Sequence, residues 1–218
     1  MSDMYREGGG PVTGLTKSRV EVLTDGIFAF AMTLLVTTMD YQNAGPGPFP
    51  ALTASSLVAL YFPDLLHYVI AFLTLAGFWI EHHIQFSYIR SIDQTFLGIS
   101  IISLLFVALI PFSTALAGDY PDTPLAAVVF DANLLAIGVT LFLTWNYATT
   151  DRRLVDKSLA ENVILINTRR AVLIPAISSL AFILALLGVT WSTWIYLVAI
   201  PGLVVILERP FLKGTRAG

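Results

Sequence analysis

The chain alternates long apolar stretches with short polar connections, and this pattern predicts six membrane-spanning helices. The apolar stretches lie at about residues 17–39, 56–86, 93–116, 124–147, 171–188 and 191–207. At about 1.5 Å per residue, the first stretch is long enough to cross a bilayer. Residues 1–16 and 209–218 are polar tails, and residues 17–208 form one transmembrane domain. We therefore expect an all-α membrane protein without a soluble catalytic domain.

Composition supports this class and excludes several kinds of chemistry. Charged residues make up 12% of the chain and hydrophobic residues 56%, whereas about a quarter of the residues in soluble domains are charged. The chain has no cysteine, which excludes disulfides, thiolate metal sites and cysteine nucleophiles. A net charge of −3 leaves no basic face for nucleic acid.

The basic residues predict the orientation. All 12 Lys and Arg residues lie in the tails and the first turn, or in the second and fourth connections, and the other three connections have none. By the positive-inside rule both termini are cytoplasmic, which requires an even number of spans. We therefore expect a multi-pass protein of the cell membrane, with a flexible N-terminal tail and a C-terminal tail in the cytoplasm.

The first predicted helix carries its charges at one end. Arg19, Glu21 and Asp25 precede an uncharged run that continues to Met39. Arg19 and Asp25 are six residues apart and do not share a helix face, so pairing requires a partner on another helix. The alternative is ordinary anchoring of the helix at the membrane interface.

A stripe follows the charged end. Gly26, Phe30, Thr33 and Thr37 recur at steps of four, three and four and share one helix face. Such a stripe can line an ion path. Alternatively, Phe30 packs inside a bundle and the threonine hydroxyls bond to carbonyls one turn earlier.

Three motifs resemble a known family. The segment R-V-E-V-L-T-D at residues 19–25, with the apolar run after it, resembles the R-x-x-x-F-S-D signature and first helix of the transmembrane protein 175 family of potassium channels. F-W-I-E-H-H at residues 78–83 looks like that family's tryptophan-histidine motif, and V-A-L-I-P-F at residues 107–112 looks like its proline-phenylalanine motif. Leu23 and Thr24 depart from the signature. The resemblance is close over residues 17–116 and loose beyond them.

The resemblance implies a homotetramer whose four first helices surround a central pore without a carbonyl filter. Phe30 then falls at the hydrophobic constriction, where the family usually has leucine or isoleucine, and Thr33 falls on a threonine layer. Thr37 lies one turn further out. The resemblance further implies that potassium is the permeant ion, and it implies no cofactor. The resemblance also implies a structural polar network of Arg19, Asp25, Trp79 and His82 that holds the pore helix.

Other polar residues of the predicted helices lie outside the stripe and the polar network. Neighbouring residues on a helix point about 100° apart, so Glu81, His82 and His83 do not predict a metal site. Asp64 and His67 share a face and are either a pH-sensitive pair or a satisfied polar pair. Asp131, inside the fourth span, is either functional or solvated near the outer surface.

The remaining classes of function are an enzyme, a transporter and a structural protein. The chain has no G-x-S-x-G, H-E-x-x-H or cysteine site, so an enzyme is not expected. A secondary ion transporter of the inner membrane remains the alternative, but no internal repeat supports it. We therefore expect a potassium-favouring channel in the lipid bilayer.

Overall fold

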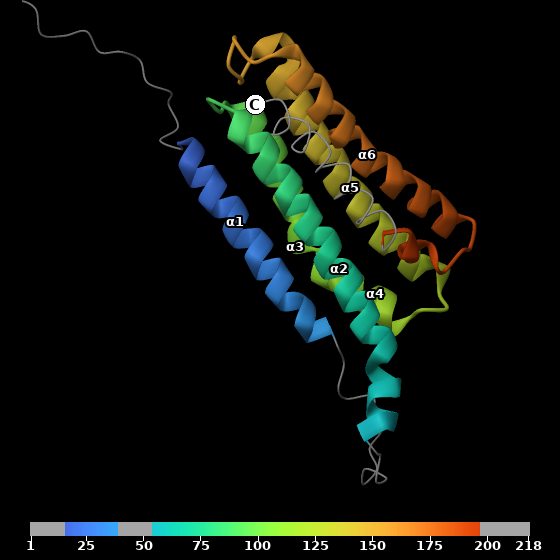
Figure 1. The fold of residues 1–218 in the computed structure, drawn as a ribbon. Helices are drawn as coiled ribbons and strands as arrows, with labels where there is room; N and C mark the ends of the chain where they lie inside the picture. The colour runs from blue at the N-terminus through green and yellow to red at the C-terminus, as the bar shows by residue number, and fades with distance from the viewer. Residues whose placement is uncertain (1–15, 39–53, 197–218) are drawn as a thin grey trace, which may run out of the picture.

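The computed structural model describes residues 16–38 and 54–196, which form a bundle of long helices lying side by side (Figure 1). The helices are α1 (Lys17–Leu34), α2 (Ala54–Tyr88), α3 (Gln94–Ala108), α4 (Ile110–Asp119), α5 (Pro124–Thr149) and α6 (Glu161–Leu186). Three short 3₁₀ turns are η1 (Leu35–Thr38), η2 (Thr150–Arg152) and η3 (Ser192–Trp194).

Within the described residues, five segments are long and apolar enough to cross a membrane: Lys17–Thr38, Asp64–Tyr88, Gln94–Asp119, Pro124–Arg152 and Glu161–Leu186. They correspond to the first five predicted spans and support a multi-pass membrane protein. The sixth predicted span, about residues 191–207, lies mostly outside the described part, as do nearly all of the N-terminal tail and the whole C-terminal tail. The count of six spans therefore stays a prediction.

The fifth span begins earlier than the sequence pattern predicts. The pattern places its start at Ala171, but α6 begins at Glu161. Arg169 and Arg170 therefore lie inside a helix and not in a connection. The prediction was wrong because it excluded charged residues from the helix, whereas Asn167 and Ala171 continue the buried face of α6. Glu161 is also favourably placed near the positive end of the helix dipole.

The third span is divided near Pro111. The helix α3 ends at Ala108, and α4 begins at Ile110 with proline in its first turn. Proline has no N–H to continue the hydrogen-bond ladder, which explains the break. At the other end of α3, Asp93 accepts hydrogen bonds from the Phe96 N–H at 2.8 Å and the Tyr147 hydroxyl at 2.7 Å, so it caps α3 and ties it to α5.

The most closely packed pair is α5 and α6. Small side chains recur along the buried face of α6, including Ala171, Ser178, Ala181 and Ala185. Opposite them, α5 presents Gly138, where an added Cβ would lie 3.0 Å from the Ile174 Cγ2. Small residues at such crossings let helix backbones approach closely. In Figure 1, α5 and α6 lie on the side of α2 and α3 away from α1, which leaves α1 at an edge of the bundle.

Candidate functional site

The helix α1 has one buried face and one free face. Val20, Thr24, Phe28 and Ala31 are buried, and Leu35 in η1 continues their row at the same helical spacing. Gly26, Phe30, Thr33 and Thr37 lie on the free face, and Phe30 is 66% exposed. Phe30 therefore does not pack inside the bundle of its own chain, which contradicts one half of the alternative. The other half, in which the threonine hydroxyls bond to carbonyls of the preceding turn, is confirmed. The predicted stripe instead lies at the bundle edge, directed away from the other helices.

The threonines of the stripe donate their hydroxyl hydrogens to their own helix. The Thr33 Oγ1 lies 2.8 Å from the Ala29 carbonyl oxygen and 2.9 Å from that of Phe30. The Thr37 Oγ1 lies 2.7 Å from the Leu34 carbonyl oxygen. A hydroxyl has one hydrogen and two lone pairs. The lone pairs of these hydroxyl oxygens are therefore left free to accept from their surroundings.

Asp25 is joined to the second helix just before the stripe begins. The indole Nε1 of Trp79 in α2 donates a hydrogen bond of 2.8 Å to the Asp25 Oδ1. The His83 ring stacks on Trp79, with ring centroids 5.8 Å apart. The structure thus brings together two of the four residues of the predicted polar network.

The other two residues lie differently. His82 is buried, stacks on Phe86 at 5.1 Å between ring centroids, and lies 6.3 Å from the Phe28 ring. Within residues 16–38 and 54–196, no hydrogen bond joins His82 to Asp25. Arg19 is exposed, and its side chain makes no hydrogen bond or ion pair within that same part of the chain.

Sequence reasoning missed a second contact at this end of α1. The Lys17 ammonium lies 5.3 Å from the centroid of the Phe86 ring in α2, a cation–π arrangement. No local sequence signal identifies it, because it depends on how the two helices pack. Lys17 and Asp25 therefore both attach the charged end of α1 to α2.

Glu81 and the two histidines after it do not converge. The Glu81 Oε1 accepts a 3.0 Å hydrogen bond from the Gln85 Nε2, whereas His82 and His83 stack on different aromatic rings. In the described part of the chain, no group of three or more histidine or acidic residues is placed to hold a metal ion.

Asp131 is fully buried in α5, with 0% of its surface exposed. This excludes the solvated position that the sequence left open. The Ser192 Oγ donates a 2.7 Å hydrogen bond to the Asp131 Oδ2. Asp64 and His67 are half-buried in α2, and their role stays a prediction.

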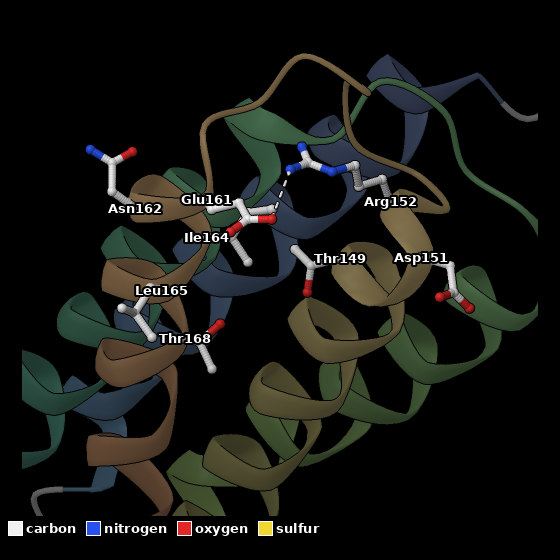
Figure 2. Close-up of a pocket in the computed structure, with 8 residues that line it drawn as sticks. All are labelled: Thr149, Asp151, Arg152, Glu161, Asn162, Ile164, Leu165 and Thr168. Carbon is white, nitrogen blue, oxygen red and sulfur yellow. Dashed lines mark ion pairs between the residues drawn. The ribbon is translucent and has the colours of Figure 1, made fainter.

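A cleft separates the end of α5 from the start of α6 (Figure 2). Arg152 and Glu161 approach each other across it, with 3.9 Å between the Nη2 and the Oε1. Asp151 and Arg152 have positive φ angles of 53° and 51°, which allows the chain to turn sharply there. The cleft is lined by Thr149, Asp151, Arg152, Glu161, Asn162, Ile164, Leu165 and Thr168.

Comparisons with known proteins identify a family. Residues 19–111 match the family described as the endosomal/lysosomal potassium channel TMEM175. The chain is 30% identical over 177 residues to a potassium channel of Chamaesiphon minutus, covering 80% of this chain and 86% of that protein. It is 31% identical over 144 residues to a potassium channel of Streptomyces collinus, covering 63% of this chain and 67% of the relative.

A solved structure has the same fold. The crystal structure of a lysosomal potassium-selective channel TMEM175 homolog from Chamaesiphon minutus superposes with a TM-score of 0.72 and 27% sequence identity. The match covers 87% of this chain and 96% of that chain. The resemblance of the three sequence motifs to this family is thereby confirmed.

Proposed function

We propose that this chain, which belongs to the TMEM175 family, conducts potassium ions passively across a membrane. The family consists of channels and not of enzymes. The bacterial relatives and the solved neighbour carry the names of potassium channels, which supports this substrate. The observation that carries the proposal is the stripe of Gly26, Phe30, Thr33 and Thr37, which lies free on the edge of the bundle.

The pore forms at the centre of four copies of the chain. A single bundle buries its core and offers no path beside α1, whereas four copies related by rotation bring four identical stripes to one axis. Closure of the tetramer around α1 would cover the exposed face that carries Phe30, Thr33 and Thr37. Each subunit then supplies one α1 to the pore wall.

The stripe selects ions by the cost of dehydration. Four Phe30 side chains form a constriction without ligands, so an ion must shed water to pass. Potassium holds its hydration less tightly than sodium and loses less free energy in this step. The Thr33 oxygens, whose hydrogens point back into α1, return part of the lost coordination. Thr37 forms a further hydroxyl layer one turn away.

The polar network serves as the scaffold of the pore helix. The Trp79 bond to Asp25 fixes the charged end of α1 against α2, and buried His82 fills the space between Phe28 and Phe86. Arg19 is exposed in the single chain, and its partner is a group of the neighbouring subunit. These residues position α1 and do not touch the permeant ion.

Ion flux through the purified protein in liposomes tests the proposal. We expect potassium flux that grows with the gradient without saturating, and a smaller sodium flux. A secondary transporter would give slow flux that saturates and depends on a second ion. A stable monomer or dimer as the active form, seen by native mass measurement, would overturn the tetrameric pore.

The chain lies in the cell membrane with both termini in the cytoplasm. The placement of the basic residues carries this part of the proposal. Reporter domains fused after Gly118 and after Thr215 should label opposite sides of the membrane. Labelling on one side only would contradict the six-span topology.

A further inference from the structure

Asp131 forms a buried polar cluster with the segment that follows α6. It lies about two helical turns inside α5 from Pro124. Its Oδ2 accepts the hydrogen bond from Ser192, but its Oδ1 has no hydrogen-bond partner within the described residues. The buried Tyr196 lies near Asp131 and Ser178, and its hydroxyl makes no hydrogen bond within the described residues. Its ring packs edge-on against Phe130, with centroids 6.3 Å apart.

The helices around this cluster supply no cation to it. Apart from Asp131 itself, α3 and α5 contain no charged residue, and Asp119 lies at the exposed end of α4. The arginines of α6 end at Arg170, about 12 Å along the helix from Ser178. The acidic residues and histidines of α2 are Asp64 and His67 in its first half and Glu81, His82 and His83 in its second half, and its other titratable residues are tyrosines, which carry no positive charge.

The chain beyond Tyr196 supplies no nearby cation in sequence either. Residues 189–207 contain no charged side chain. Neither the ion pair of Arg90 with Asp156 nor that of Arg152 with Glu161 involves Asp131. A carboxylate at this depth would therefore stand in an apolar surrounding with no counter-charge, which is costly in a membrane.

We propose that Asp131 is a proton-binding site, with the proton on Oδ1. A protonated Oδ1 becomes a donor directed at the Tyr196 hydroxyl, while Oδ2 continues to accept from Ser192. The Asp131 Oδ1 and the Tyr196 hydroxyl then gain each other as hydrogen-bond partners after small shifts of the two side chains. A hard metal cation needs about six oxygen ligands, whereas the described residues of this cluster offer one carboxylate, from Asp131, and the hydroxyls of Ser192, Tyr196 and Ser178.

The bound proton stabilises the contact of residues 192–196 with α5. Ser192 and Tyr196 follow the turn after α6, whereas Asp131 belongs to α5, so the cluster joins elements that are 61 residues apart in sequence. Figure 1 shows η3 on the opposite side of the bundle from α1. The site is therefore distinct from the stripe, and its test does not depend on conduction.

Infrared spectroscopy of the purified full-length protein in nanodiscs tests the site directly. We expect the carbonyl stretch of a protonated carboxylic acid at neutral pH, which disappears in Asp131→Asn. The matched control, Asp119→Asn at the exposed end of α4, should leave this band unchanged. If Asp131→Asn instead loses the band of an ionised carboxylate and keeps the acid band, the proposal is overturned.

Two further measurements keep the proposal falsifiable if Asp131→Asn folds poorly. Ser192→Ala removes the donor to Oδ2 and should shift the frequency of the acid band without abolishing it; an unshifted band overturns the assignment. Exchange of potassium for sodium should leave the band unchanged, and a band that depends on the cation would assign the site to a metal ion.

The proposal predicts the direction in which heat stability changes with pH. Only the wild-type carboxyl can ionise, so the heat stability of the wild type should fall relative to Asp131→Asn as the pH rises through the titration of the site. A constant difference between the two proteins from mildly acidic to alkaline pH contradicts the proposal.

Discussion

The indole of Trp79 donates a 2.8 Å hydrogen bond to the carboxylate of Asp25, across 54 residues of sequence. The bond joins α2 to α1 one residue before Gly26, where the free stripe begins. A hydrogen bond to a carboxylate is stronger than one between neutral groups. It therefore sets the position of the helix that we propose lines the pore.

Removing the indole donor should weaken this attachment. Trp79→Phe keeps an aromatic ring and loses the bond, which is worth about 1 kcal/mol between membrane helices. Asp25→Ala should be at least as damaging, because the Trp79 N–H is then left unpaired. Both variants should lower heat stability or tetramer yield in size-exclusion chromatography. Trp191→Phe, at an exposed position, is the control. Normal assembly with altered conductance would place Asp25 in the permeation path.

Shortening Phe30 should widen the proposed constriction. In Phe30→Ala an ion keeps more of its water, so we expect a higher conductance and a larger gain for sodium than for potassium. Currents of both ions across a planar bilayer measure this. Leu105→Ala removes an exposed apolar side chain from α3 and should leave the currents unaltered. If Phe30→Ala keeps wild-type currents and selectivity, the stripe does not line the pore.

Removing the Thr33 hydroxyl should reduce the preference for potassium. Thr33→Val keeps the shape of the side chain and deletes the oxygen that accepts from the pore side. Thr24→Val deletes a similar hydroxyl, bonded 2.9 Å from the Val20 carbonyl oxygen, on the buried face of α1. We expect a lower ratio of potassium to sodium current for the first variant only. Equal ratios in both variants would remove Thr33 from the selection step.

Adding one methyl group at Gly138 should disturb the packing of α5 on α6. The new Cβ would lie 3.0 Å from the Ile174 Cγ2 and 3.2 Å from the Pro175 backbone nitrogen, and overpacking of this kind costs about 1–3 kcal/mol. Gly98→Ala meets nothing within 4 Å and serves as the control. Thermal unfolding in detergent should show a loss for Gly138→Ala alone. Equal stability of the two variants would mean that α6 moves aside freely.

The loop between α5 and α6 should loosen in acid. Ser158 donates hydrogen bonds to Asp156 from its hydroxyl at 2.6 Å and its N–H at 2.7 Å, and Arg90 pairs with the same carboxylate. The Ser158 bonds, followed by Arg90, hold the pKa of Asp156 below its ordinary value. The stabilisation is therefore present at neutral pH and is lost as the pH falls through the lowered pKa.

Amide hydrogen exchange of residues 151–159 measures this effect. Exchange in the wild type, corrected for its intrinsic pH dependence, should accelerate in acid. In Asp156→Asn it should already be faster at neutral pH and show no further step. A step that persists in Asp156→Asn would assign the acid sensitivity to another group.

Much of the helical architecture follows from local sequence. Apolar length and helical periodicity are properties of consecutive residues, and they correctly predicted five spans within the described residues and a stripe from Gly26 to Thr37 on one face. The three motifs identified the family because they are short and contiguous. The start of α6 was missed, because the charges of Arg169 and Arg170 obscured a helix that tertiary packing continues.

Tertiary structure alone decided which groups meet. Periodicity places Phe30 on a face but does not tell whether that face is buried; the packing of α1 at the bundle edge exposes it. Trp79 donates a hydrogen bond to Asp25, and Lys17 lies over the ring of Phe86. Both contacts form because the burial of their apolar faces brings α1 and α2 together. Asp131 is enclosed for the same reason: burial depends on the neighbours of a helix, and these come from distant parts of the chain.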